Sequence, residues 1–552
     1  MDQVRRMLLK GFACVAGSSV ILPVFSSNVF AANTYVSSAV ANEVRTKAAR
    51  LANYATFGAN ETTVNHITNI GWEAWIDEQL SMPITLLYPS ATLSTDKPTQ
   101  AHHYSAWWTN AMVAPDQLQQ RVGFALSQWF VISSHHPFLS GRDWTTINFH
   151  DMLLKGGTGS FVGLLNQVST HPAMCAYLSS LYNKKADPES GTIPDENYAR
   201  EMMQLFTCGA EKRYQNGNFA IDAEGNRKPN YTENDVQELA RVFTGIGIKD
   251  AKAWGKEGGD WLSPVIEYPE YHDDGSKRFM GETIPQGLSL EGDIKAALDI
   301  ILEQRTNSVA GNFSRFMIQQ LTISNPRGSY VRDVSIVFKE SNWDMKSMVK
   351  AIMLHPDAID GRSNKRCETG RIKEPLLWYA SARRAIAPPR DKILLPYTGP
   401  LLNHKEPETG VIFNQAPLAA PSVFGFFPRD YQPESIRGEH TDYIQYTYPE
   451  AYIYDWNNIV TISNKLWGNI IKKDDDVADF YDALTQSGNN ELFADYVLDR
   501  LLFGNYRAVL RDELIILLNS SGPTADTAKV RDALVLVTSS PDFLIINLPQ
   551  EI

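Results

Sequence analysis

Residues 114–130 read APDQLQQRVGFALSQWF, and this stretch decides the expected fold. The Ala-Pro-Asp at its beginning is a helix-start signal. Apolar side chains then recur at Leu118, Val122, Ala125, Leu126, Trp129 and Phe130. Spacings of three and four residues place such side chains on one face of an α-helix. The stretch therefore predicts an amphipathic helix that packs against a core.

A second amphipathic helix is predicted from residues 232–243. The Thr232 hydroxyl and the Asp235 carboxylate stand three residues apart and can cap the first helical turn. Apolar residues follow at helical spacing, while alternating patterns are sparse along the chain. We therefore predict a mainly α fold: a large multi-helix domain with a small β-hairpin insertion and long ordered loops.

The hairpin is expected within about residues 250–290. Residues 265–268 and 277–280 read as short strands, and they flank the turn signal Asp273-Asp274-Gly275. Residues 388–450 hold many Pro, Gly, Tyr and Phe and little periodicity, which predicts a long ordered loop region. Because no Gly/Ser-rich or Pro-rich linker divides residues 32–552, we expect one large helical domain there.

The first 31 residues read as a signal peptide. Arg5-Arg6 precedes a mildly apolar run that ends before the small-residue site Val29-Phe30-Ala31. The paired arginines favour the twin-arginine route, which exports folded proteins, over the general secretory route. The apolar run is shorter than the roughly 18 residues of a membrane span, so we expect no transmembrane anchor after processing. The expected location is periplasmic or secreted.

The chain is acidic, with a formal net charge of −12. Removal of residues 1–31 would take away three basic residues and one acidic residue, which makes the mature charge −14. A surface of this sign argues against binding to nucleic acid phosphates. Three cysteines would remain: Cys175, Cys208 and Cys367. Their odd number and the absence of a C-x-x-C pair do not indicate a disulfide framework.

Several motifs resemble those of the bacterial domain-of-unknown-function family numbered 1800. They lie at residues 49–58, 120–122, 124–128, 171–174, 194–207, 235–236, 243–245, 272–275, 415–417 and 421–424. The resemblance covers almost all of the mature chain. Other members carry a Trp-His-Asn-His-like motif where this chain has Leu126-Ser127-Gln128-Trp129, so the position supplies no histidine here. The resemblance names no reaction. It implies a partner: a second exported family, numbered 1501 and similar to sulfatases, commonly encoded beside it.

The best candidate site is the helix predicted in residues 194–207, PDENYAREMMQLFT. Its polar residues fall on one arc: Glu196, Asn197, Arg200, Glu201 and Gln204. Glu196 with Arg200, Asn197 with Glu201, and Arg200 with Gln204 have the four-residue spacing that brings side chains together. The arc could form one wall of a functional cleft. It could equally be a salt-bridged helix face without catalysis.

We expect His171 and the His272-Asp273 turn to face this arc. In that arrangement Glu201 would be the base or a cation ligand, Arg200 an anion clamp, and His272 a proton carrier or second ligand. The candidate metal ligands are Glu201, Asn197, His272 and Asp273. The alternatives are a structural role for His171 at a helix end and a plain turn at Asp274-Gly275.

Signatures of familiar enzymes are absent from the sequence. It has no Gly-x-Ser-x-Gly elbow, Walker loop, Gly-x-Gly-x-x-Gly or His-Glu-x-x-His, and no nucleotide, flavin or haem signature. The paired histidines at 102/103 and 135/136 would point apart and are poor chelating pairs. The cofactor is unknown, with a divalent cation as one candidate. Two functions stay open: a cation-assisted hydrolase that acts on an envelope or extracellular polymer, and a noncatalytic envelope protein that binds or assembles with the co-exported hydrolase-like partner.

Replacing Arg5-Arg6 by Lys-Lys should trap the precursor in the cytoplasm, because the twin-arginine translocon reads that pair. Cell fractionation followed by immunoblotting measures this. The wild-type chain should yield processed protein outside the cytoplasm. Normal export of the double-lysine variant would contradict the predicted route.

Overall fold

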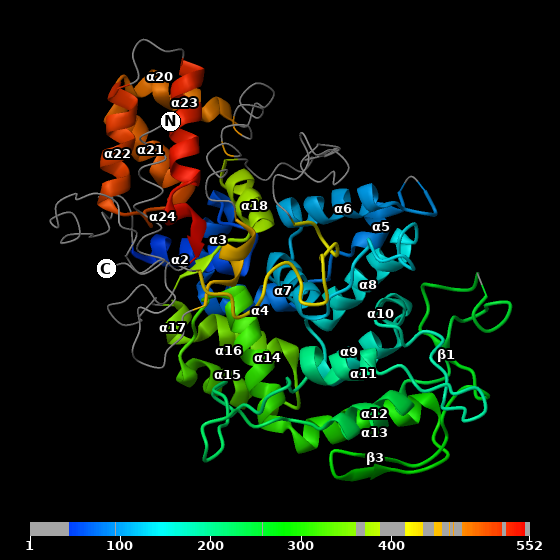
Figure 1. Cartoon of the computed structure of the whole chain (residues 1–552). Helices are drawn as coiled ribbons and strands as arrows, with labels where there is room; N and C mark the ends of the chain where they lie inside the picture. The colour runs from blue at the N-terminus through cyan, green and yellow to red at the C-terminus, as the bar shows by residue number, and fades with distance from the viewer. Residues whose placement is uncertain are drawn as a thin grey trace.

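The computed structural model describes residues 43–93, 95–256, 258–359, 370–386, 415–433, 447–454, 463, 467, 477–520 and 526–546. Helices dominate this part of the chain, and its strands form only two-stranded sheets, so the predicted mainly α fold is confirmed (Figure 1). The predicted signal peptide at residues 1–31 lies outside the described residues. Residues 388–414 and 434–446 of the predicted loop region also lie outside them.

The helices are taken in chain order, in three groups. The first group is α2 (Glu43–Ala55), α3 (Glu61–Ile70), α4 (Trp72–Ser81), α5 (Leu87–Ala91), α6 (Gln100–Val113), α7 (Gln117–Trp129), α8 (Asp143–Gly156), α9 (Phe161–Thr170) and α10 (Pro172–Tyr177). The second is α11 (Asn197–Glu201), the π-helix η1 (Met202–Phe206), α12 (Glu233–Val242), α13 (Leu290–Gln304), α14 (Thr306–Leu321), α15 (Gly328–Glu340), α16 (Met345–Leu354), α17 (Pro356–Ile359) and α18 (Pro375–Ile386). The third is the 3₁₀ helix η4 (Pro449–Ile453), α20 (Ala478–Ser487), α21 (Asn490–Leu502), α22 (Ala508–Ser520), α23 (Asp526–Thr538) and α24 (Pro541–Leu544).

One continuous apolar core joins these groups, with buried side chains from Ala48 to Ile546. Helices α20–α23 pack on one another at one end of the molecule, whereas α12, α13 and β3 lie at the opposite end (Figure 1). Helix α21 also contacts α18 and α24, which ties the C-terminal helices to the rest. Within the described residues, no helix has both the length and the apolar character needed to cross a membrane.

Helix α7 forms where the period predicted it, and its polar side chains are buried together with the apolar ones. These polar side chains bond to backbone carbonyls. Gln119 donates to the carbonyls of Gln79 and Met82, both at 2.8 Å, and Arg121 donates to the Gln320 carbonyl at 2.8 Å. Buried polar groups are tolerated when they are paired in this way.

A polar centre lies beside the C-terminal half of α7. It has three charged members, Arg371, Glu374 and Glu450, and all three side chains are buried. The Arg371 guanidinium lies 2.9 Å from the Glu374 carboxylate and 3.0 Å from the Glu450 carboxylate. Gln128 of α7 and Gln415 donate to Glu374 at 2.9 and 2.6 Å. We call these five residues the polar centre. Burial raises the pKa of Glu450 to about 7, with the charge of Arg371 opposing the rise.

Side-chain caps begin several helices. The predicted cap of α12 is confirmed: Thr232 accepts from the Asp235 backbone, and the Asp235 carboxylate accepts from the Thr232 backbone. His171, His355 and Ser540 each precede a proline that ends one helix and begins the next. Their side chains accept a backbone N–H of the new first turn, which explains the recurrence of this pattern.

The predicted β insertion is present, but its strand pairing was predicted wrongly. Strand β2 (Ile266–Glu267) pairs with β1 (Ile246–Gly247), and β3 (Lys277–Phe279) pairs with β4 (Glu282–Ile284). The hairpin turn is Met280-Gly281, with φ of 50° and 92°, rather than the Asp-Asp-Gly at 273–275. Two successive positive φ values match the twist of a two-residue hairpin. The third sheet pairs β5 (Arg371–Ile372) with β6 (Ile545–Ile546).

Lys373 follows β5 and lies buried with its ammonium 4.1 Å from the centre of the Phe543 ring. Burial lowers its pKa to about 7. Above about pH 7 the buried amine of the folded protein has lost its proton, whereas the amine of the unfolded chain still carries one. The unfolded state therefore binds more protons in this range, and the free energy of unfolding rises with pH. Between about pH 7 and about pH 8.5 the unfolding free energy should rise by up to about 1.4 kcal/mol per pH unit.

Urea denaturation across this pH range measures the effect. Lys373→Met should abolish most of the rise, because it removes the titrating amine. Lys295→Met is the matched control, since Lys295 is exposed and pairs with Asp299. An equal rise in wild type and Lys373→Met would contradict the assignment.

Candidate functional site

The predicted site helix is α-helical for only one turn. Helix α11 ends at Glu201, and the next five residues form the π-helix η1. The Thr207 hydroxyl donates to the Met202 carbonyl, five residues earlier, at 2.7 Å. A π-turn has more residues per turn than an α-turn, so the predicted pairing of Arg200 with Gln204 is wrong: no hydrogen bond joins them among the described residues. Short π segments are frequent at functional sites.

Arg200 is held between two glutamates. Its Nη2 lies 3.0 Å from Glu196 Oε2, as the four-residue spacing predicted. The same guanidinium also forms a two-pronged pair with Glu233, at 2.8 and 3.1 Å, which the sequence did not reveal because Glu233 begins α12. Two carboxylates occupy the guanidinium, so Arg200 is a poor clamp for a further anion.

Glu201 differs from the rest of the arc. Its side chain is 8% exposed, and its Oε2 is buried without a hydrogen-bond partner. Burial raises the pKa of Glu201, and the charge of Arg200 opposes the rise. Asn197 is exposed and makes no side-chain bond to Glu201 among the described residues. A carboxyl that is largely buried and unpaired is the type of group that takes and gives protons in enzymes.

Tyr177 lies within range of the Glu201 charge, and His136 contacts Tyr177. The rings of His136 and Tyr177 meet edge to face, with centroids 5.4 Å apart. Burial and the charge of Glu201 raise the pKa of Tyr177 to about 12, so its phenol keeps its proton. Burial lowers the pKa of His136, and its Nδ1 is buried without a partner. We call Glu201, Tyr177 and His136 the acid–base cluster.

His272 belongs to a different, closed group. Its Nδ1 bonds to the Thr244 carbonyl at 2.8 Å, and its Nε2 lies 3.3 Å from Asp293 Oδ2. Lys277 approaches the same oxygen of Asp293 at 2.5 Å, and all three charged side chains are at most 2% exposed. Burial alone would lower the pKa of His272, but Asp293 and the Thr244 carbonyl outweigh it and raise the pKa. His272 and Glu201 share no described contact, so the structure does not bring these two predicted residues together.

The remaining two predicted residues also have structural partners. Asp273 forms a two-pronged pair with Arg241, at 2.8 and 3.0 Å. His171 begins α10, and its Nε2 lies 3.0 Å from Asn148 Oδ1. Burial lowers the pKa of His171 to about 3, so the ring is neutral at physiological pH. His171 fits the structural alternative stated for it, whereas Asp273 is held by its ion pair with Arg241 and not by the hairpin turn expected there.

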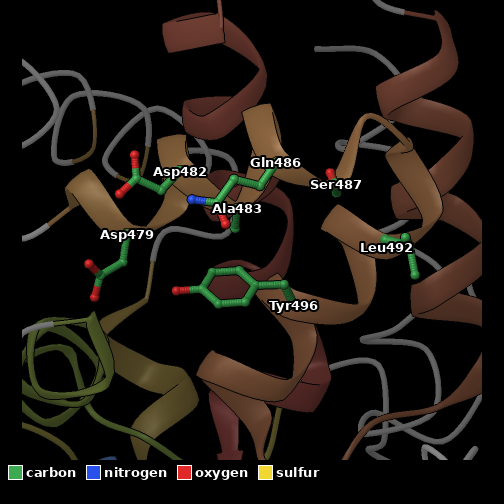
Figure 2. Close-up of a pocket in the computed structure, with 7 residues that line it drawn as sticks. All are labelled: Asp479, Asp482, Ala483, Gln486, Ser487, Leu492 and Tyr496. Carbon is green, nitrogen blue, oxygen red and sulfur yellow. The ribbon is translucent and has the colours of Figure 1, made fainter.

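Within the described ranges, no three His, Cys, Asp or Glu side chains are placed to hold one metal ion. Glu201, Asn197, His272 and Asp273 therefore do not form a joint cation site there. A shallow groove lies elsewhere, between α20 and α21 (Figure 2). Asp479, Asp482, Gln486, Leu492 and Tyr496 are among its lining residues. It offers carboxylates and a phenol but no basic side chain, and none of the predicted site residues lines it.

These features define a mainly helical protein in which an unpaired glutamate adjoins a π-helix. A sequence model of the family described as "Protein of unknown function (DUF1800)" matches residues 50–545. The chain therefore belongs to the DUF1800 family, as its motifs indicated. No curated protein and no solved structure matches the chain.

The His272 group should act as structure rather than as a catalytic pair. Asp293→Asn should lower the free energy of unfolding by roughly 3–5 kcal/mol, because it leaves the Lys277 ammonium buried without a counter-charge and removes the carboxylate beside His272. Glu233→Gln should change stability little, because its pair with Arg200 is exposed. Urea denaturation at neutral pH compares the two variants. Equal, small effects would show that the buried group is not an ion-pair network.

Proposed function

We propose that the protein is an exported hydrolase in which Glu201 performs acid–base catalysis on an envelope or extracellular polymer. The observation that carries the proposal is the Glu201 carboxyl: it is mostly buried, has an oxygen without a hydrogen-bond partner, and its charge reaches the Tyr177 phenol. Export to the periplasm or medium by the twin-arginine route is part of the proposal and rests on Arg5-Arg6.

The cluster can carry out hydrolysis in two proton transfers. The Glu201 carboxylate takes a proton from water while the water oxygen attacks the electrophilic carbon of the scissile bond. The protonated carboxyl then gives that proton to the leaving group as the bond to carbon breaks. Tyr177, which stays a neutral phenol, can donate a hydrogen bond to the oxygen on which negative charge develops. His136 packs against Tyr177 and restrains its ring.

This proposal assigns the proton transfers to a side chain instead of a cation. The reason is the donor set, since the described residues gather no three metal ligands. The alternative function is a noncatalytic protein that binds the sulfatase-like partner implied by the family resemblance. The acid–base cluster favours the enzyme. An unpaired buried carboxyl lowers stability, and a catalytic role would account for its presence despite that cost.

Glu201→Gln should abolish hydrolysis and leave folding intact. A panel of p-nitrophenyl esters and glycosides, purified cell-wall sacculi and dye-linked polysaccharides provides the substrates. On any substrate that the wild type cleaves, the variant should lose roughly 10²–10⁴-fold in rate. Its thermal midpoint should not fall, because the substitution removes a buried charge. Glu233→Gln is the control and should keep its activity, since Glu233 is exposed.

The pH profile gives a second measurement. A base must be deprotonated, so kcat/KM should rise with pH through a pKa higher than that of an ordinary glutamate. A full rate for Glu201→Gln would overturn the assignment of Glu201. Absence of cleavage across the panel, with tight binding to a co-exported partner, would favour the noncatalytic alternative.

A further inference from the structure

A second group of charged side chains consists of three arginines that are far apart in the sequence. Arg213 follows the π-helix, Arg315 lies on α14, and Arg429 lies in the segment 415–433. All three are partly exposed, so solvent reaches them. No ion pair with a carboxylate is formed by any of them in the described part of the chain. We call them the arginine cluster.

Gly217 connects two members of the cluster. Arg213 Nη1 donates to the Gly217 carbonyl at 2.7 Å, and Arg315 Cδ lies 3.5 Å from the position that a Cβ on Gly217 would occupy. Gly217 has a φ of 78°, a left-handed conformation that glycine adopts without strain. The turn therefore brings the side chain of Arg213 next to that of Arg315.

Aromatic faces fix the third arginine. The Arg429 guanidinium carbon lies 4.3 Å from the centre of the Trp129 ring and 4.7 Å from that of Phe316. Trp129 and Phe316 are both buried, so this platform is rigid. Arg213 in turn lies 3.7 Å from the centre of the Phe219 ring. Stacked guanidinium groups lose little freedom when they bind a ligand.

The local charge balance is positive although the whole chain is acidic. Glu211 lies near Arg213 but is paired with Arg227 at 2.8 Å. Asp430 is the other nearby carboxylate, and it is exposed. Burial and mutual repulsion lower the pKa of Arg213 and of Arg429 to about 10 each, which still leaves them charged at neutral pH. Among the described residues these positive charges outnumber the nearby carboxylates and repel one another, and a bound anion would relieve this repulsion.

We propose that Arg213, Arg315 and Arg429 form a binding site for a phosphate or sulfate group. Guanidinium forks match tetrahedral oxyanions in geometry and charge, and each can supply two parallel hydrogen bonds. The ligand is a free oxyanion or a phosphate or sulfate group carried on a polymer. This site goes beyond the proposed hydrolysis and shares no residue with the acid–base cluster.

Isothermal titration and thermal melting at constant ionic strength test the site. Inorganic phosphate and inorganic sulfate should bind saturably and raise the melting temperature, whereas chloride should not. Binding to dextran sulfate is compared with binding to neutral dextran to test a polymer-borne ligand. Tighter binding per sulfate group on dextran sulfate than for inorganic sulfate would identify a polymer as the source, and the reverse would identify a free anion. Either result supports the site.

Arg315→Gln and Arg429→Gln should each weaken sulfate binding by roughly tenfold or more, because each removes charge-assisted hydrogen bonds. Arg332→Gln is the control, since Arg332 is exposed on α15 and paired with Asp333. If Arg429→Gln fails to fold, Arg315→Gln still tests the site, because the aromatic stacking of Arg429 does not involve it. Glu201→Gln should bind sulfate like the wild type, which separates this proposal from the proposed hydrolysis. Absence of anion-specific binding, or its persistence in both arginine variants, would overturn the site.

Discussion

The fold depends on the pairing of charges in its interior. Arg371, Glu374 and Glu450 are almost completely buried, and an ionised side chain in that position is tolerated only with partners at hydrogen-bond distance. Those partners come from distant parts of the chain: Gln128 from α7 and Gln415 from the segment 415–433. Because each group needs the others, a shift of one segment would leave several charges unpaired. The polar centre therefore sets the arrangement of the helices around it.

The helical part of the fold could be predicted because helix signals are local. The cap at Thr232 and Asp235 depends on residues three apart, and it forms as its spacing indicated. Two other features depend on contacts between distant residues. The Asp-Asp-Gly at 273–275 resembles a hairpin turn, but Arg241 from α12 binds Asp273. The polar face of α7 resembles a solvent face because its partners are carbonyls more than 30 residues away.

The sequence indicates only part of the candidate site, for the same reason. It makes Glu201 a candidate because Glu201 lies on a polar arc whose members are close in sequence. Tyr177, which the charge of Glu201 reaches, and His136, which contacts Tyr177, cannot be predicted, since only tertiary packing places them there. His272 is a candidate by its residue type, but no local pattern indicates that Asp293 and Lys277 enclose it. A residue type indicates a possible chemistry, but its burial and partners decide whether it is available.

The π-helix relates the two proposed sites. Glu201 immediately precedes η1, and the carbonyl of Phe206 at its end accepts a hydrogen bond from Trp129 Nε1 at 3.1 Å. The same Trp129 ring stacks against the guanidinium of Arg429. A wider π-turn shifts the residues after it relative to an α-helix, so it changes the position of Phe206 with respect to Glu201. Glu201 and Arg429 are thus linked through η1 and the Trp129 ring, so the π-turn bears on the placement of both side chains.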